Sequence, residues 1–274
     1  MAVSVRTRAT SRVSLPSMGD VSLIVLNLLG LVAYLHPFIS AGATKNDSRW
    51  FQHSTDAPLV FAAIAALCMV LVVAELTEGS LNSKSLAGLG MLAAMAAVLR
   101  TITLPAGANL YFLLVILGGY AFGWRLGFLL GALSFFLSAV VTGGIGPWLP
   151  FQMFASAWMG LSAGALRPVA VSLRIRGRAE VWLVVGFGIA WGLLFGAITN
   201  LWFWPFWVGG PDITYQPGIG VLEALRRYWN FYFLTSFGWD LARSICNAVL
   251  IAILGGPLLR AMVRFQRRFN WKLG

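Results

Sequence analysis

The sequence predicts an all-α protein that crosses a membrane several times. Of its 274 residues 59% are apolar and only 11% are charged, whereas a soluble domain has about 45–50% apolar and about 25% charged residues. The mean hydropathy is strongly positive. The apolar residues also gather in runs of about 20, which is the length that crosses a bilayer as a helix.

Eight apolar runs are long enough to span, although the fourth is short. The predicted spans are 20–38, 58–76, 85–104, 108–122, 126–142, 149–166, 180–203 and 231–259. They divide the chain into three parts. Residues 1–19 form a basic, Ser/Thr-rich segment that we expect to be disordered, 20–79 an extra two-helix unit, and 80–274 a six-helix core.

The distribution of basic residues predicts the orientation, because loops on the cytoplasmic side of a membrane carry an excess of Lys and Arg. With the N-terminus inside, fourteen of the basic residues fall in inner segments: Arg6, Arg8, Arg12, Lys84, Arg125, Arg167, Arg174, Arg176, Arg178, Arg260, Arg264, Arg267, Arg268 and Lys272. Only Lys45, Arg49, Arg226 and Arg227 fall in outer segments. We therefore expect a plasma-membrane protein with both termini in the cytoplasm.

Glycines recur along the fifth and sixth runs, at Gly123, Gly127, Gly131, Gly160 and Gly164. In lipid, small residues at this spacing let two helix backbones approach closely. The sequence thus predicts close packing between these runs, with a tight corner at 143–148.

The corner places Trp148 and Gln152 four residues apart, on one helix face with Trp158 nearby. An aromatic ring beside an amide is suited to holding a flat, polar small molecule. The alternative is that Trp148 only anchors its helix at the level of the lipid headgroups.

The outer segment 204–230 is rich in aromatic residues, among them Trp204, Trp207 and Tyr228. A loop of this length is uncommon unless it serves as a lid or a binding loop. The alternative is an interfacial segment that lies on the membrane.

Polar residues inside the runs are costly in lipid and often functional. Asp240 and Arg243, three residues apart, form either a structural ion pair or a site where Asp240 meets a ligand. The predicted topology places one polar residue from each of four runs at the outer level: Asn109, Gln152, Asn200 and Asp240. Such a gathering of polar groups predicts an outward-facing pocket.

Enzymatic, metal and cofactor chemistry find no support in the sequence. It contains no HExxH, P-loop, kinase or dinucleotide motif, and neither CxxC nor a Cys/His cluster. The string from Gly160 to Gly164 matches GxSxG but lies within an apolar run, where helix packing explains it. We expect no enzyme activity, metal or cofactor.

The third run is rich in alanine, and Ala93 and Ala97 lie four residues apart. This spacing gives a smooth helix face that packs either against another protein or against a helix of the same chain.

The six runs from residue 85 onward resemble the substrate-binding S component of energy-coupling-factor (ECF) vitamin transporters. The resemblance rests on an ordered set: the alanine pattern followed by Val98, Leu99 and Arg100, the stretches 119–131 and 144–164, and the last run from Asp240 to Arg260. It implies a protein that binds a vitamin or similar micronutrient on the outer side. It also implies a membrane-embedded T component and two ATPases as partners, with Ala93 and Ala97 at the T-component contact.

From the residues and this resemblance we expect the ligand to be bound by Asn109, Trp148, Gln152, Asn200, Trp204, Trp207, Tyr228 and Asp240. Two alternatives are a stand-alone secondary transporter and a membrane enzyme acting on lipid or isoprenoid. The first requires ionisable residues near the midplane and inverted repeats, and the second requires clustered acids or histidines. The sequence does not name the nutrient.

Overall fold

The computed structural model describes residues 17–41, part of 62–77, 83–104 and 108–268. Residues 1–16 of the N-terminal segment that we expect to be disordered lie outside the described residues. The first outer loop, with Lys45, Arg49 and His53, and most of the second predicted span also lie outside them.

The described chain is helical, as predicted, and contains no named strand. Its helices are α1 (Met18–Ala41), α3 (Ser83–Thr101), α4 (Tyr111–Phe122), α5 (Trp124–Thr142), α6 (Leu149–Ser172), α7 (Arg178–Phe203), a short 3₁₀ turn η3 (Trp204–Phe206), α8 (Val221–Thr235) and α9 (Phe237–Arg268). Within the described residues, α1, α5, α7 with η3, and α9 contain apolar windows long enough to cross a membrane.

The last predicted span, 231–259, is wrong at both ends. The helix that crosses the bundle is α9, which begins at Phe237 and continues to Arg268. Residues 221–235 form the separate helix α8, so the C-terminal half of the supposed outer loop is helical. The apolar residues Phe231, Tyr232 and Phe233 continue the hydropathy of α9, which is why the sequence pattern merges the two helices.

The centre of the bundle is a backbone-to-backbone crossing of α5 and α6. A Cβ atom added at Gly160 would lie 2.0 Å from the carbonyl oxygen of Gly127, and one at Gly127 would lie 2.1 Å from the carbonyl oxygen of Gly160. Gly131 meets the Ser156 backbone, and Gly164 meets the backbone at Trp124, equally closely. The predicted packing of glycines between these helices is confirmed.

Helix α1 packs against the outside of α6 rather than standing apart from the core. Its Asn27 side chain accepts a 2.7 Å hydrogen bond from Trp158 Nε1, and the Tyr34 hydroxyl donates to the carbonyl oxygen of Phe151 at 2.5 Å. Gly30 leaves room for the rings of Phe154 and Trp158. Trp158 therefore faces α1 and does not line the mouth predicted around Trp148.

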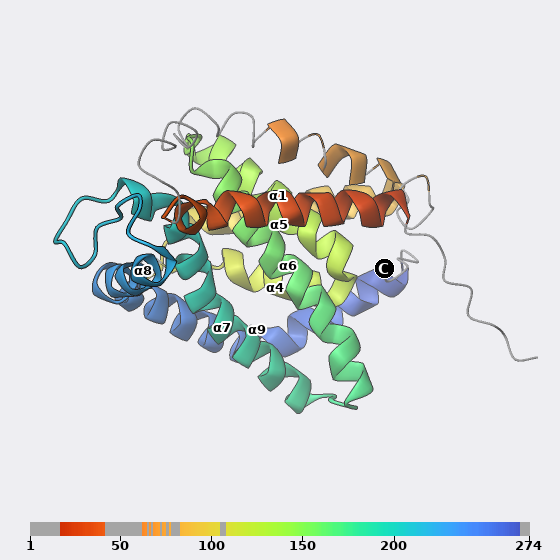
Figure 1. The fold of residues 1–274 in the computed structure, drawn as a ribbon. Coiled ribbons are helices and arrows are strands. Elements are labelled where there is room, and N and C mark those ends of the chain that lie inside the picture. The colour runs from red at the N-terminus through yellow and green to blue at the C-terminus, as the bar shows by residue number, and fades with distance from the viewer. Residues whose placement is uncertain are drawn as a thin grey trace, which may run out of the picture.

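One end of the bundle carries α8 and the segment before it, and the C-terminal end of α9 lies at the opposite end (Figure 1). Because the chain alternates in direction, the end with α8 also holds the start of α4, the start of α6 and the end of α7. We refer to it as the α8 end.

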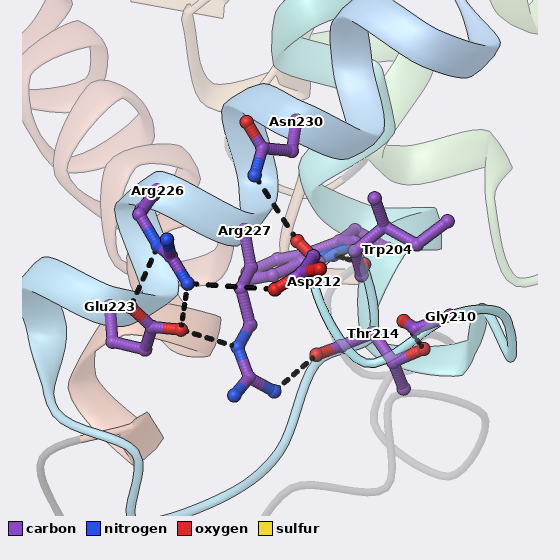
Figure 2. A network of polar contacts seen from close by, with 9 residues as sticks. Trp204, Gly210, Asp212, Thr214, Glu223, Arg226, Arg227 and Asn230 are labelled. Atoms are coloured by element: carbon purple, nitrogen blue, oxygen red, sulfur yellow. Dashed lines mark hydrogen bonds and ion pairs between the residues drawn. The ribbon is translucent and has the colours of Figure 1, made fainter.

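A polar network ties residues 209–214 to α8 (Figure 2). Arg226 and Arg227 both donate to the Glu223 carboxylate, at 2.9 and 2.8 Å, and Arg227 also donates to the carbonyl oxygen of Thr214 at 3.2 Å. Asp212 lies 3.6 Å from Arg226. The hydrogen bonds from Arg226 and then Arg227 hold the pKa of Glu223 below its usual range, so this network persists at neutral pH.

Candidate substrate-binding site

The packing seam between α7 and α9 positions the polar residues of the last span. Gly188, Gly192 and Gly196, four residues apart on α7, leave room for larger side chains of α9. Ser244 Oγ donates to the carbonyl oxygen of Ile189 at 2.9 Å, and Asn247 Nδ2 donates to that of Gly188 at 3.1 Å. The glycine ridge therefore lets polar groups be buried against backbone acceptors inside the bundle.

Asp240 lies at the top of this seam, paired with Arg243. Arg243 donates to Asp240 Oδ1 at 2.6 Å and to the carbonyl oxygen of Gly192 at 3.2 Å. The Asp240 side chain is only 3% exposed, and its second oxygen, Oδ2, faces Gly196 without a hydrogen-bond partner among the described residues. The ion pair that the sequence left open is present, and the Tyr232 side chain lies close to the same carboxylate.

Arg100 approaches the same end of the bundle from α3. It donates to Ser138 Oγ at 3.0 Å, and its guanidinium carbon lies 4.1 Å from the centre of the Phe135 ring. No carboxylate of the described chain lies within ion-pair distance of it. A cation in a membrane helix without an acidic partner is a candidate functional group.

Phenylalanine rings join the two arginines into one layer. The Phe135 and Phe195 rings stack with centroids 6.1 Å apart, and Phe112 meets Phe195 edge-on at 5.0 Å. Arg243 lies 5.4 Å from Phe112 and 5.5 Å from Phe195. We call Arg100, Asp240, Arg243 and these three rings the charged layer.

Tyr111 fixes one side of this layer. Its hydroxyl contacts Ser134 Oγ at 3.0 Å, the Gly131 carbonyl oxygen at 3.2 Å and Ser156 Oγ, so α4, α5 and α6 meet at one buried atom. Its ring packs edge-on against Phe135 at 5.6 Å. The rings of the layer are therefore held by a rigid part of the core.

The predicted residues Trp204, Trp207 and Tyr228 come together in an aromatic cluster at the α8 end. Trp204 is fully buried, its ring centroid lies 5.3 Å from that of Tyr228, and its Nε1 donates to the Ile213 carbonyl oxygen at 2.8 Å. Trp207 packs against Phe231 at 5.6 Å, and its Nε1 is buried without a partner among the described residues. We call this cluster, which also contains Phe38 and Tyr215, the aromatic cap.

The aromatic cap and the charged layer are neighbours. The Tyr228 hydroxyl donates to the carbonyl oxygen of Ala197, and the Tyr232 hydroxyl donates to that of Leu193 at 3.4 Å, so α8 lies against the last turns of α7. Burial, followed by the nearby Asp240 carboxylate, raises the pKa of Tyr232 above its usual range. Both tyrosines are therefore neutral at physiological pH.

The other predicted residues are more dispersed. Trp148 is 40% exposed, bonds back to Gly144 at 3.3 Å and meets Trp202 edge-on at 6.2 Å, and Gln152 is half-buried one turn further along α6. Asn109 precedes α4, and its Oδ1 accepts a hydrogen bond from the Tyr111 backbone N–H at 3.2 Å. Asn200 is half-buried in the last turn of α7. All lie at the α8 end, but only Asp240 among the predicted residues belongs to the charged layer.

The structure places Ala93 and Ala97 inside the protein. Both are buried on the face of α3 that packs into the core, 0% and 1% exposed. The exposed small residues of this helix are Ala87, Gly90 and Ala94, and a Cβ atom added at Gly90 would meet nothing within 4 Å. The smooth face predicted for α3 exists, but two alanines assigned to it point the other way.

Sequence reasoning missed Phe112, Phe135 and Phe195, and it used Arg100 only as one of the residues that carry the family resemblance. The three rings do not differ in sequence from lipid-facing phenylalanines. The position of Arg100 within an apolar run, without an acid on its own helix, could have identified it.

Two hollows in the described surface lie elsewhere. One of about 500 Å³ lies at the opposite end, between the start of α7 and the end of α9, beside Arg178, Glu180 and Arg260. The other lies along α8, beside Leu222, Arg226 and Trp229. The described residues contain no group of His, Cys, Asp or Glu that could hold a metal ion.

Comparison with known proteins gives one result. No curated protein and no solved structure matches the chain. The family model of the ECF transporter, substrate-specific component, matches residues 84–255. This range runs from the start of α3 into α9 and includes the whole charged layer. A match over more than half of the chain shows that this multi-pass membrane protein belongs to the family of substrate-specific components of ECF transporters.

Proposed function

We propose that the chain binds a vitamin-like nutrient at the α8 end of the bundle, between the charged layer and the aromatic cap. The observation that carries this proposal is the collection of partnerless polar atoms there: Asp240 Oδ2, Trp207 Nε1 and Trp202 Nε1 are buried without hydrogen bonds in the described chain. Buried polar groups are normally hydrogen-bonded, so such atoms are suited to a ligand. The Lys and Arg distribution supports placing this end of the bundle on the outer side.

The chemistry of the charged layer favours a planar ligand with an anionic or carbonyl group. Arg100 has guanidinium donors beyond its bond to Ser138, and Arg243 lies over two rings. Aromatic stacking adds about 0.5–1.5 kcal/mol per ring beyond burial. Further contacts in the proposal come from the other predicted residues: Asn109, Trp148, Gln152, Asn200, Trp204, Trp207 and Tyr228.

Replacing Arg100 with glutamine should reduce ligand affinity roughly tenfold or more, because a hydrogen bond to a charged group contributes about 1.5–3 kcal/mol. The small molecule that the protein retains during purification is identified by mass spectrometry and then titrated by calorimetry. The matched control is Arg264→Gln, which removes an exposed arginine from the opposite end of α9 and should leave affinity unchanged.

The same titration with Gln152→Ala and Asp240→Ala tests the proposed contacts more widely, and both variants should bind more weakly. Unchanged affinity in Arg100→Gln, Gln152→Ala and Asp240→Ala together would place the ligand elsewhere and overturn the proposed site.

We further propose that a membrane-embedded T component and two ATPases supply the energy for import, as in other transporters of this family. The T component would pack on the exposed face of α3 formed by Ala87, Gly90 and Ala94, where small residues allow close helix approach. This assignment replaces Ala93 and Ala97, which are buried in the core.

Replacing Ala94 with tryptophan should abolish co-purification of the T component, because the large ring would separate the two helices, while ligand affinity should not change. Ile245→Trp on α9, at a position that is 57% exposed, is the control and should leave the complex intact. An intact complex in Ala94→Trp would show that another face of the protein carries the contact.

A further inference from the structure

Helix α8 presents an exposed apolar stripe on one side. Leu222, Leu225, Trp229 and Phe233 follow each other at three- and four-residue spacing and so share a helix face. They are 83%, 38%, 46% and 60% exposed. A face of this kind on a helix that is already packed elsewhere requires an occupant.

The opposite side of α8 is buried in the protein. Ala224, Tyr228, Phe231 and Tyr232 are each less than 5% exposed, and they pack against the aromatic cap and the end of α7. The exposed stripe is therefore not the side by which α8 attaches to the bundle.

A third side of α8 is polar. Glu223, Arg226 and Arg227 form the ion pairs with each other and with the preceding segment, and Asn230 Nδ2 donates to the Asp212 carbonyl oxygen at 3.4 Å (Figure 2). Leu234, near the end of the helix, is the exception on this side. Polar groups thus border the apolar stripe along one edge, as expected where a helix meets water.

Other apolar side chains are exposed at the same end of the bundle. Phe203 at the end of α7 and Phe206 in η3 are 42% and 47% exposed, and Trp239 and Leu241 at the start of α9 are 61% and 43% exposed. Exposed apolar side chains at the ends of α7 and α9, two helices long and apolar enough to cross a membrane, are suited to contact with lipid. α8 has 15 residues, about 22 Å, which is too short to cross the hydrocarbon core of about 30 Å.

We propose that α8 is an interfacial helix that lies in the lipid leaflet at its own end of the bundle, with the stripe Leu222, Leu225, Trp229 and Phe233 among the acyl chains. Interfacial helices place an apolar face about 5–10 Å into the headgroup boundary and a charged face toward water. Tryptophan is enriched at this depth. Lipid would contact the exposed stripe of α8, while the aromatic cap contacts its buried side. Lipid contact therefore helps to position Tyr228 and Tyr232 over the α7–α9 seam.

The test is the depth of α8 in a bilayer, measured with nitroxide labels on single cysteines. The background is Cys68→Ala with Cys246→Ala, which removes the two native cysteines. Labels are placed at 222, 225, 229 and 233 on the stripe, at 226 and 230 on the polar side, and at 245 on α9 as the lipid-facing reference. The protein is reconstituted in phosphatidylcholine–phosphatidylglycerol vesicles, and each label is exposed to oxygen and to a water-soluble nickel chelate.

For each label we compare the ratio of its collision rate with oxygen to its collision rate with the nickel chelate. This ratio should be several-fold higher for labels on the stripe than for labels at 226 and 230. It should also approach the ratio measured at 245. Because Leu222 and Leu225 are exposed and lie outside the buried aromatic cluster, their labels remain informative if Trp229→Cys or Phe233→Cys disturbs folding. Equal nickel access on both sides of α8 would overturn the proposal. Strong dipolar broadening between labels at 222 would also overturn it, since it would assign the stripe to a second copy of the chain.

Discussion

Replacing Gly160 with alanine should destabilise the protein by about 2 kcal/mol or more, near the upper end of the range for overpacking. The added methyl group would lie 2.0 Å from the carbonyl oxygen of Gly127, which is backbone and cannot rotate away. Helices α5 and α6 would have to separate, and the contacts of Gly131 and Gly164 along the same crossing would loosen with them. The effect is measured by thermal unfolding in detergent, with size-exclusion chromatography of the heated samples as the readout.

Gly186→Ala is the matched control, because a Cβ atom at this position in α7 meets nothing within 4 Å. Alanine is favoured over glycine in a helix interior by about 1 kcal/mol, so this variant should be as stable as the original chain or slightly more stable. If Gly160→Ala and Gly186→Ala unfold at the same temperature, the close crossing of α5 and α6 is wrong.

Replacing Asp240 with alanine should cost about 3–5 kcal/mol, because it leaves Arg243 as an unpaired charge in the bundle. The double variant Asp240→Ala with Arg243→Met should recover much of this loss, since no buried charge remains. The same unfolding assay on the two variants checks this expectation. An exposed pair provides the comparison: Glu223→Ala on α8 should lower stability far less than Asp240→Ala, because solvent screens surface ion pairs.

The double variant also separates the structural role of the pair from its proposed role in binding. If its stability recovers and the retained ligand is still lost, Asp240 and Arg243 belong to the binding site. If stability recovers and affinity equals that of the original chain, the pair is structural, and neither Asp240 nor Arg243 contacts the ligand.

The sequence was most informative where one physical requirement governs a long segment. The length and hydropathy of the apolar runs predicted the spans now seen as α1 and α3–α7, because only helices satisfy their own backbone hydrogen bonds in lipid. The spacing of Gly127, Gly131, Gly160 and Gly164 predicted the close crossing of α5 and α6. The ordered set of stretches that resemble the S component predicted the family that the family-model match shows.

The sequence was less informative where hydropathy is ambiguous. Phe231, Tyr232 and Phe233 suit either a span or an amphipathic helix, and the break at Ser236 that ends α8 has no strong sequence marker. On α3, alanines occupy both the buried and the exposed faces, so periodicity could not show which alanines point outward.

The sequence by itself determined that this is a helical membrane protein with a close glycine crossing, because chain-wide hydropathy and glycine spacing follow from the bilayer as a solvent. Its S-component type came from the ordered resemblance, which the family match shows. Only the tertiary structure decided which side chains meet. It paired Asp240 with Arg243 on Gly196, set Arg100 over Phe135 and gathered Trp204 and Tyr228 into the aromatic cap. The reason is that such contacts depend on the rotation of each helix about its axis, which packing between helices fixes and local sequence does not.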